Sequence, residues 1–356
     1  MQKNIAFYIS DHNMEHAFRN VPILQNMLKM EEEVQIFVKS GKMQVEWMKS
    51  YLKPDERLHF LAMEMKDRET DLWDTLAQGE EEFLREEKIG LVISDICPWI
   101  FLSADNLRIK SLLLANYTWA DLAKEEEEKE EYLSCYELAS RFFIYDLHVP
   151  ELTGYGVEYE MVSLLNRPYN MEVIESLEEK IGGPFVFVDL PKWQEEKKDE
   201  AAHGDERNHE EKIGRTGRDL SPLPYRFVIT EGTPLKGENV IVLSKETKNP
   251  QDYVAASRYL IGWGSWNTIS QALLSNKKAA FFVQAEIPMS SRMIGTLVER
   301  NQCLLAEENE VFQMEELLKK LEAFSYSYEQ EYYNSDYDLA KKILFAYPEK
   351  RRRNRS

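Results

Sequence analysis

Short apolar runs alternate with helix-like segments through the first third of the chain. The apolar runs predict strands at 5–10, 34–38, 58–63, 90–94 and 111–115. Apolar residues recur at helical spacing between them and predict helices at 17–30, 45–52 and 72–87. Pro22 is expected in the first turn of its helix, where a missing N–H costs little. Repeated strand–helix units indicate a parallel sheet with helices on both faces.

A second alternating unit begins near residue 171. A helix at 172–181 is expected to end at Gly182 and Gly183. Further strands are predicted at 185–190, 225–230, 240–243, 259–261 and 279–283. Further helices are predicted at 268–275, 291–299, 314–324 and 335–346. Between the two units, the acidic run 124–131 is typical of a solvated helix face. Residues 132–145 carry aromatic and apolar side chains at helical spacing, which is typical of a helix packed on the core.

These patterns predict an α/β protein with two doubly wound domains, because 356 residues are more than one hydrophobic core usually serves. We expect domains at 1–160 and 161–330, followed by a helix and basic tail at 331–356. The charged segment 193–219 is expected to be a disordered insertion in the second domain. The basic tail is typical of a frayed end, and weak contact with acidic lipid or RNA is the alternative.

The net charge of −19 argues against general nucleic-acid binding and against electrostatic docking on anionic lipid. No apolar run approaches the roughly 18 residues of a membrane span, and the N-terminal residues lack a cleavable signal pattern. The three cysteines form no metal or disulfide pattern. We therefore expect a cytoplasmic protein.

The segment 259–273 predicts a phosphate-binding site. It reads as a strand, a turn with Gly262 and Gly264, and a helix that Ser265, Asn267 or Thr268 can cap. The glycines are expected to turn the backbone sharply and to leave room beside it. The first N–H groups and the dipole of the helix would favour an anion there, so a nucleotide-derived ligand is the first hypothesis.

Ligands of doubly wound sheets bind beyond the carboxyl ends of the strands, which selects further positions. In the first domain these include residues 11–16, Asp95 and 116–119; in the second they include Asp189, Glu231 with Gly232, and 284–288. His12 and His16 are spaced to share a helix face, but no third metal ligand is evident nearby. His16 is a candidate general base, with a polar helix cap as the alternative.

Residues 8–24, containing Asp11-His-Asn-Met-Glu-His-Ala-Phe-Arg19, resemble the His-Gly-Phe-Gly-His-Ala-Thr-Arg motif of a glycosyltransferase-like family that includes the N-terminal half of plant arabinokinases. The resemblance continues at 91–98, 111–119, 252–257 and 262–273, and more faintly at 285–294. More distantly, the layout is similar to the peptidoglycan N-acetylglucosaminyltransferase and to nucleotide-sugar hydrolases of pseudaminic acid synthesis. The resemblance implies the GT-B fold, two Rossmann-like domains with a central cleft.

The resemblance also implies roles for individual residues. It places His16 at the catalytic centre and assigns the donor diphosphate to Gly262, Gly264, Ser265 and Thr268. Glu286 would lie near the donor sugar, Gln271 replaces the acidic residue that holds the donor ribose, and His12, Asp95 and Trp119 would lie on the acceptor side. The remaining donor-side candidates are Asn267, Glu231 and Gly232.

Two departures from the family pattern stand beside His16. The family's glycines are here Asn13 and Glu15; glutamate adopts a left-handed conformation only at a cost, and its charge would lie where a diphosphate approaches. The sequence thus predicts a metal-independent glycosyltransferase that uses a nucleotide sugar, most simply a UDP-sugar, and no other cofactor. The acceptor is left open: a carbohydrate, a lipid-linked molecule or a protein. An impaired relative acting as a binding partner and a nucleotide-sugar hydrolase are the alternatives.

Overall fold

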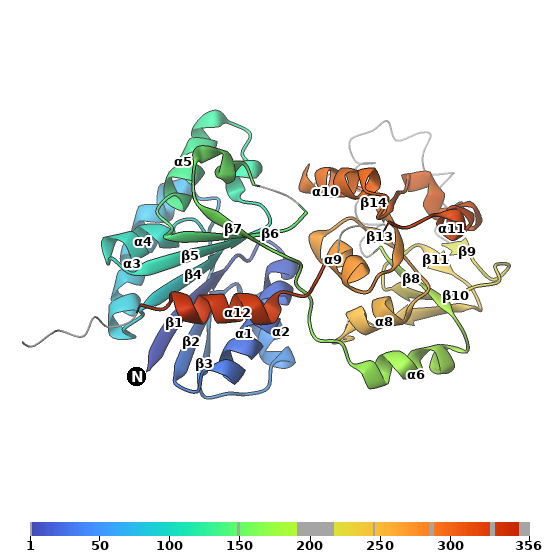
Figure 1. The fold of residues 1–356 in the computed structure, drawn as a ribbon, viewed down its shortest axis with the longest axis horizontal. Helices are drawn as coiled ribbons and strands as arrows, with labels where there is room; N and C mark the ends of the chain where they lie inside the picture. The colour runs from blue at the N-terminus through green and yellow to red at the C-terminus, as the bar shows by residue number, and fades with distance from the viewer. Residues whose placement is uncertain are drawn as a thin grey trace, which may run out of the picture. The chain divides into compact units, whose positions relative to one another are not determined.

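The computed structural model describes residues 2–147, 150–190, 217–244, 246–284, 288–327 and 332–348. The chain divides into two compact units. The first unit contains Met1–Arg167 together with Tyr333–Ser356, and the second contains Pro168–Tyr332. Each unit has a parallel α/β sheet of its own, as Figure 1 shows.

The first sheet is parallel throughout its described strands, in the order β3-β2-β1-β4-β5-β6-β7. Its strands are β1 (Lys3–Ile9), β2 (Val34–Ser40), β3 (Leu58–Ala62), β4 (Leu91–Asp95), β5 (Lys110–Ala115), β6 (Arg141–Tyr145) and β7 (Tyr159–Val162). From β1 the chain adds β2 and β3 on one side, and it then returns to add β4 on the other. The direction reverses between β1 and β4, which makes their carboxyl ends the switch point of this sheet.

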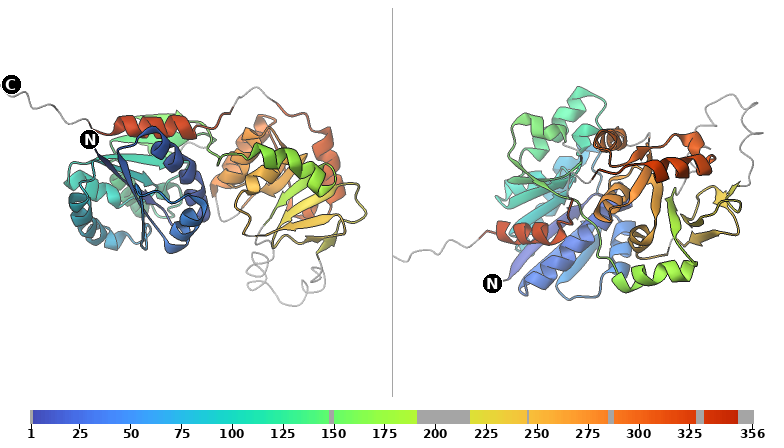
Figure 2. Two further views of the ribbon diagram at one scale, coloured as in Figure 1. Left: turned by 90° about the horizontal axis from the view of Figure 1, so that it is seen from below. Right: turned by 45° about the vertical axis from the view of Figure 1, so that its right-hand side comes forward.

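Helices cover both faces of the first sheet (Figure 1). Right-handed crossovers place α1 (Met14–Met30) and α2 (Lys42–Tyr51) on one face. They place α3 (Trp73–Glu86), α4 (Ile100–Asn106) and α5 (Glu126–Tyr136) on the other. The helix α12 (Asp336–Ala346) packs against α1, and the views of Figure 2 agree. The helix predicted at 335–346 is therefore confirmed, and it belongs to the first unit.

The second sheet is also parallel in its described strands, in the order β12-β10-β8-β13-β14-β15. Its strands are β8 (Phe185–Asp189), β10 (Arg226–Thr230), β12 (Val240–Leu243), β13 (Tyr259–Trp263), β14 (Lys278–Phe282) and β15 (Leu304–Leu305). The helices of the unit are α6 (Met171–Ile181), α8 (Pro250–Ala256), α9 (Trp266–Leu274), α10 (Pro288–Glu299) and α11 (Met314–Ala323). Leu317 and Leu321 of α11 pack on the apolar face that Val186, Ile261 and Phe282 share. Here the switch point lies between β8 and β13.

The two parallel sheets confirm the predicted α/β architecture, and the Gly182 cap is confirmed as well: Gly182 has φ 87° and ends α6. The helical interpretation of 132–145 was wrong beyond Tyr136, because residues 141–145 form strand β6. Pro22 was also misplaced. The helix begins earlier, at Met14 behind an Asn13 cap, so Pro22 lies within it.

The charged insertion lies mostly outside the described residues. Its last residues, Arg218–Asp219, form the short strand β9, which pairs with β11 (Leu235–Lys236). The basic residues that follow 348 also lie outside the described part of the chain. Within that part, no helix is long and apolar enough to cross a membrane.

Candidate functional site

A buried polar cluster occupies the switch point of the first unit. Helix α1 supplies one face of it, because positions i, i+3 and i+4 of a helix lie together. Strand β4 ends at the acidic member, and the residues after β5 complete the set. We call this the His16 cluster: His16, Arg19, Asn20, Asp95, Asn116 and Tyr117, each no more than 5% exposed.

Asp95 is the centre of the His16 cluster. Its Oδ1 atom lies 2.9 Å from Nδ1 of His16, and its Oδ2 atom accepts the Nε–H of Arg19 at 2.7 Å. Arg19 Nη2 and Asn20 Nδ2 also donate to this carboxylate. Asp95 is completely buried, so its place is to hold His16 and Arg19 rather than to face an acceptor.

The outer bonds of the cluster tie it to the next strand. Arg19 donates through Nη1 to the side-chain oxygen of Asn116, and His16 Nε2 lies 3.2 Å from the hydroxyl of Tyr117. Asn20 donates to the carbonyl of His16 at 2.8 Å. Both ring nitrogens of His16 therefore have protein partners, and only 1% of its surface is exposed.

Charge and burial keep His16 neutral near pH 7. Burial lowers the pKa of His16 to about 4; the Arg19 guanidinium lowers it too, while Asp95 acts in the opposite sense. Burial alone would raise the pKa of Asp95, but Arg19 and His16 outweigh it and hold that pKa well below its usual range. A neutral imidazole is the form that a general base needs.

The backbone beside Asp95 is strained. Ile96 has φ 59°, in the left-handed region that a β-branched side chain rarely adopts. The hydroxyl of Tyr136 donates to the carbonyl of Ile96 at 2.7 Å, and Ser94 Oγ donates to the carbonyl of Cys97 at 2.7 Å. These bonds hold a turn that ends β4 sharply behind the carboxylate. Strain of this kind costs roughly 1–3 kcal/mol, and it gathers at functional sites.

His12 and Trp119, both predicted on the acceptor side, lie together in the first unit. Their ring centroids are 4.9 Å apart, and Arg68 lies 5.6 Å from the Trp119 ring. They line a cavity of about 290 Å³ that also includes Asp11 and Asp67. Burial lowers the pKa of His12. His12 precedes α1, so His12 and His16 do not share a helix face.

Asp67 is a buried acid that sequence reasoning missed. Its Oδ2 atom accepts the hydroxyl of Ser10 at 2.6 Å. Its Oδ1 atom has no partner with hydrogen-bond geometry among the described residues. Burial raises the pKa of Asp67 to about 7, against the opposing effects of Ser10, Cys97 and Trp119. A carboxyl of this kind is half protonated near neutral pH.

Asp189 and Thr268 mark the switch point of the second unit. Asp189 ends β8, and the hydroxyl of Thr268 donates to its Oδ2 atom at 3.4 Å. Burial raises the pKa of Asp189, while Thr230 and Thr268 oppose the rise. Ser265 caps α9 as predicted, because its Oγ accepts the backbone N–H of Thr268 at 3.2 Å. Asn267 is the half-buried residue of this first turn.

The two glycines of the predicted phosphate turn serve packing. Gly262 lies inside β13, where a β-carbon would come 3.1 Å from the carbonyl oxygen of Asp189. A β-carbon on Gly264 would come 2.3 Å from Cδ1 of Ile294. Neither glycine has a positive φ. The expectation that they turn the backbone sharply and leave open room was therefore wrong, since Ile294 of α10 and the end of β8 take up that space.

The other donor-side candidates, Gln271, Glu231, Gly232 and Glu286, lie in different environments or outside the described residues. Gln271 lies on α9 and is 5% exposed. Glu231 and Gly232 form an exposed turn after β10, in which Thr233 N–H donates to the carbonyl of Thr230 at 3.2 Å. Gly232 has φ 95°, so this turn requires a glycine. Glu286 lies outside the described residues.

The departures beside His16 do not strain the backbone. Asn13 is extended, with φ −151°, and its side-chain oxygen accepts the N–H of Glu15 at 2.9 Å. Glu15 is in the first turn of α1. Neither residue adopts the left-handed conformation that the family's glycines suggested.

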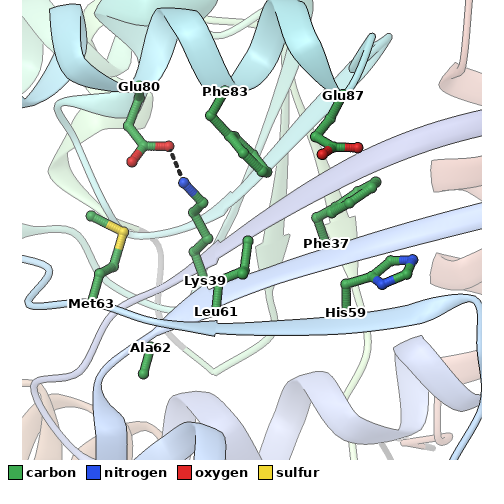
Figure 3. A pocket seen from close by; sticks show the side chains of 9 residues that line it. All are labelled: Phe37, Lys39, His59, Leu61, Ala62, Met63, Glu80, Phe83 and Glu87. Carbon is green, nitrogen blue, oxygen red and sulfur yellow. Dashed lines mark hydrogen bonds and ion pairs between the residues drawn. The ribbon is translucent and has the colours of Figure 1, made fainter.

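A larger cavity of about 480 Å³ in the first unit is lined by residues of β2, β3 and α3 (Figure 3). Phe37 stacks on His59 at 4.7 Å, and Phe83 of α3 approaches from above. The one cation that lines it, Lys39, is paired with Glu80 and lies 3.6 Å from the Phe83 ring centroid. With its charge satisfied internally, this cavity offers less chemistry than the His16 cluster.

Arg19 and Asn20 were also missed by sequence reasoning. Their spacing from His16 puts them on its helix face, which is a signal that sequence carries. Tyr117 lies in the range 116–119 that the strand-end rule selected, but that rule does not distinguish it from its neighbours. No group of three or more metal-ligating side chains gathers in the described part of the chain.

The comparisons with known proteins rest on structure. No family model matches the chain. No curated protein matches it either. Several solved structures match it over nearly its full length at low sequence identity.

Three of these structures illustrate which kinds of protein match the chain. The spinosyn forosaminyltransferase SpnP is 12% identical, with TM-score 0.61, covering 98% of this chain and 100% of its own. A putative UDP-N-acetylglucosamine 2-epimerase from Listeria monocytogenes is 12% identical, with TM-score 0.60, covering 97% and 95%. Arabidopsis thaliana UGT89C1, complexed with UDP-L-rhamnose, is 11% identical, with TM-score 0.58, covering 98% and 100%.

The likeness confirms the predicted GT-B fold, with two Rossmann-like domains. It establishes the fold alone at these identities. The similar structures include both a glycosyltransferase and an epimerase, so the fold does not choose the reaction. The choice must come from the residues at the two switch points.

Proposed function

We propose that this chain is a glycosyltransferase that moves a sugar from a nucleotide diphospho-sugar, most simply a UDP-sugar, to an acceptor hydroxyl. The observation that supports this most is the His16–Asp95 pair at the switch point of the first unit. In such a pair the carboxylate fixes one tautomer of the imidazole, and the other ring nitrogen can take a proton. The GT-B fold makes a nucleotide sugar the natural donor to test.

The donor would bind to the second unit, at the start of α9. The dipole of a helix favours an anion at its N-terminus, and the amides of Ser265 and Asn267 would meet the diphosphate there. The amide of Gly264 is not part of this proposal, because it donates to the carbonyl of Phe282 at 2.8 Å. Thr268 and Asp189 are proposed to hold hydroxyls of the donor.

The proposed reaction requires no metal ion or further cofactor. Backbone N–H groups and the helix dipole would stabilise the negative charge that develops on the departing diphosphate. The proton lost by the acceptor hydroxyl would pass into the His16 cluster. The acceptor class stays open between a carbohydrate, a lipid-linked molecule and a protein.

Titration calorimetry and turnover test the donor site together. The chain would be titrated with UDP, TDP, GDP and their sugar forms, and diphosphate release would be followed with mixed acceptors and with EDTA. Thr268→Val is expected to weaken nucleotide affinity about tenfold, because it removes a hydroxyl worth about 1.4 kcal/mol. Thr296→Val on α10 is the matched control, since its hydroxyl donates within its own helix to the carbonyl of Arg292 at 3.1 Å. No binding of any nucleotide would overturn the proposal.

A second candidate is a relative that binds the nucleotide sugar without turning it over. Two observations favour it: Arg19 shares the charge of Asp95, and His16 is almost completely buried. Binding without turnover in the same experiment would support it. Release of free sugar in the absence of any acceptor would instead indicate a nucleotide-sugar hydrolase, with water in place of the acceptor.

A further inference from the structure

Tyr117 lies at the outer side of His16. It follows β5, next to Asn116, and its hydroxyl is 3.2 Å from Nε2 of His16. Its ring meets the imidazole edge to face, with centroids 5.9 Å apart. Tyr117 thus joins the end of β5 to His16 on α1.

The bonds of the cluster assign the proton on His16. An ionised carboxylate can only accept, so the 2.9 Å contact between Nδ1 and Asp95 requires a proton on Nδ1. Nη2 of Arg19 lies 2.8 Å from Nδ1 and can only donate, so this contact taken alone favours the opposite tautomer; we assign the proton to Nδ1 because Nη2 already has Oδ1 of Asp95 as its acceptor. Nε2 is then the unprotonated nitrogen of the neutral ring. It accepts the hydroxyl proton of Tyr117.

This arrangement blocks direct contact between a substrate and His16. The one basic nitrogen of the ring, Nε2, is occupied by Tyr117, and the ring is 1% exposed. Tyr117 is 5% exposed and is the partner on that side. A hydroxyl approaching Nε2 would meet the phenol first.

We propose that Tyr117 takes the proton of the acceptor hydroxyl and passes its own phenol proton to Nε2 of His16. The inference rests on the proposed function. As the acceptor oxygen bonds to the anomeric carbon, the bond from that carbon to the diphosphate breaks, and its electron pair leaves with the diphosphate. The acceptor proton moves to the Tyr117 oxygen, the phenol proton moves to Nε2, and the imidazolium remains beside Asp95. Two protons therefore move in one step.

The electrostatics agree with a relay rather than a stable phenolate. Burial raises the pKa of Tyr117 well above its ordinary value, although Arg19 acts against the rise. The phenol is therefore protonated at neutral pH and has a proton to give. It can lose that proton only while it gains another, as a concerted relay requires.

Tyr117→Phe removes only the relaying oxygen. We expect turnover to fall at least a hundredfold, as for loss of a general base, while nucleotide affinity stays within twofold. The matched control is Tyr132→Phe, which removes the hydroxyl of another buried tyrosine in the first unit, bonded to Glu128. It is expected to retain full turnover.

Two further measurements separate a relay from a structural role. The solvent deuterium inventory of the unaltered chain should be curved, because two protons move, and any residual rate of Tyr117→Phe should give a straight line. Nitrogen-15 spectra of the unaltered chain should show His16 protonated at Nδ1 and not at Nε2 across pH 6–8. A protonated Nε2, or turnover retained within twofold in Tyr117→Phe, would overturn the relay alone. Absence of turnover in the unaltered chain would overturn the proposed function and the relay with it.

Discussion

The Nδ1 atom of His16 on helix α1 lies 2.9 Å from the Oδ1 atom of Asp95, which ends strand β4. Both side chains are almost completely buried, and Arg19 bonds the same carboxylate. The arrangement gives His16 a fixed orientation and a low basicity at once. The contrast between those two properties leads to the first predictions.

The titration of His16 should lie far below that of an ordinary histidine. We expect a midpoint near pH 4, because burial and the Arg19 charge both lower the pKa. Nearly all of His16 is then already neutral at pH 6. Turnover should therefore be flat from pH 6 to 8 and fall only as the pH approaches 4. Histidine resonances followed by NMR would measure the midpoint. A value near 6.5 for His16 would contradict the prediction.

Replacing Arg19 should release His16 and destabilise the first unit. Arg19→Met removes a cation that lowers the pKa of His16, so that pKa should rise. It also leaves Asp95 buried without its main partner, which typically costs about 3–5 kcal/mol. Urea unfolding and NMR titration would measure the two effects.

The control for this change is Arg85→Met. Arg85 is 60% exposed and forms an i,i+4 ion pair with Glu81, worth about 0.3–0.5 kcal/mol. If Arg19→Met cost no more than this control, the charge balance described for Asp95 would be incorrect.

Asp67 should make the fold less stable as the pH rises. Its folded pKa is raised to about 7, against 3.8 for the ordinary group. Between those values the folded state keeps a proton that the unfolded state has lost, so stability falls with increasing pH. The loss is complete above pH 7 and amounts to about 4 kcal/mol.

Asp67→Asn tests this directly, because asparagine cannot ionise. The stability gain over the unaltered chain should grow from pH 4 to pH 7 and then level off. Thermal unfolding at several pH values would measure it, with the exposed Asp105→Asn as control. A difference independent of pH would show that the Asp67 carboxyl does not titrate in this range.

Gly264 should be required for packing before any ligand binds. A β-carbon there would clash with Cδ1 of Ile294 at 2.3 Å, so Gly264→Ala should cost about 1–3 kcal/mol. Adding Ile294→Ala removes the clashing atoms, and the double variant should lose less than the sum of the two. Urea unfolding of the unaltered chain, the two single variants and the double variant gives the coupling free energy between the two positions.

Gly295→Ala is the matched control for this series. Gly295 directly follows Ile294 in α10, and a β-carbon there would meet nothing within 4 Å. Because alanine favours a helix interior by about 1 kcal/mol over glycine, it should be neutral or stabilising. Strictly additive effects of Gly264→Ala and Ile294→Ala would show that the glycine is not kept for this contact.

Much of the architecture could be predicted because the signals are local. Apolar runs and helical spacing located most strands and helices, and Ser265 and Gly182 marked a helix start and a helix end. The error at 141–145 has a physical cause: a short apolar run satisfies a helix and a buried strand equally. Its pairing with β5 and β7 made it a strand.

The candidate site was predictable only in part. The rule of strand ends selected His16, Asp95 and Asp189, because it depends on the order of elements alone. It could not select Asp67, which follows β3 through an irregular loop. It also could not show that the Asp95 carboxylate would be hydrogen-bonded to Arg19.

The sequence by itself determined the parallel α/β character, the helix caps and the residues available at each strand end, because these depend on neighbours a few positions apart. Only the tertiary structure decided how those residues are used. It paired His16 with Asp95, placed the Tyr117 hydroxyl against Nε2 of His16, and filled the space beside Gly264 with Ile294. Such contacts join positions far apart in the chain, and their charge and burial depend on side-chain packing that hydrophobic patterns do not record.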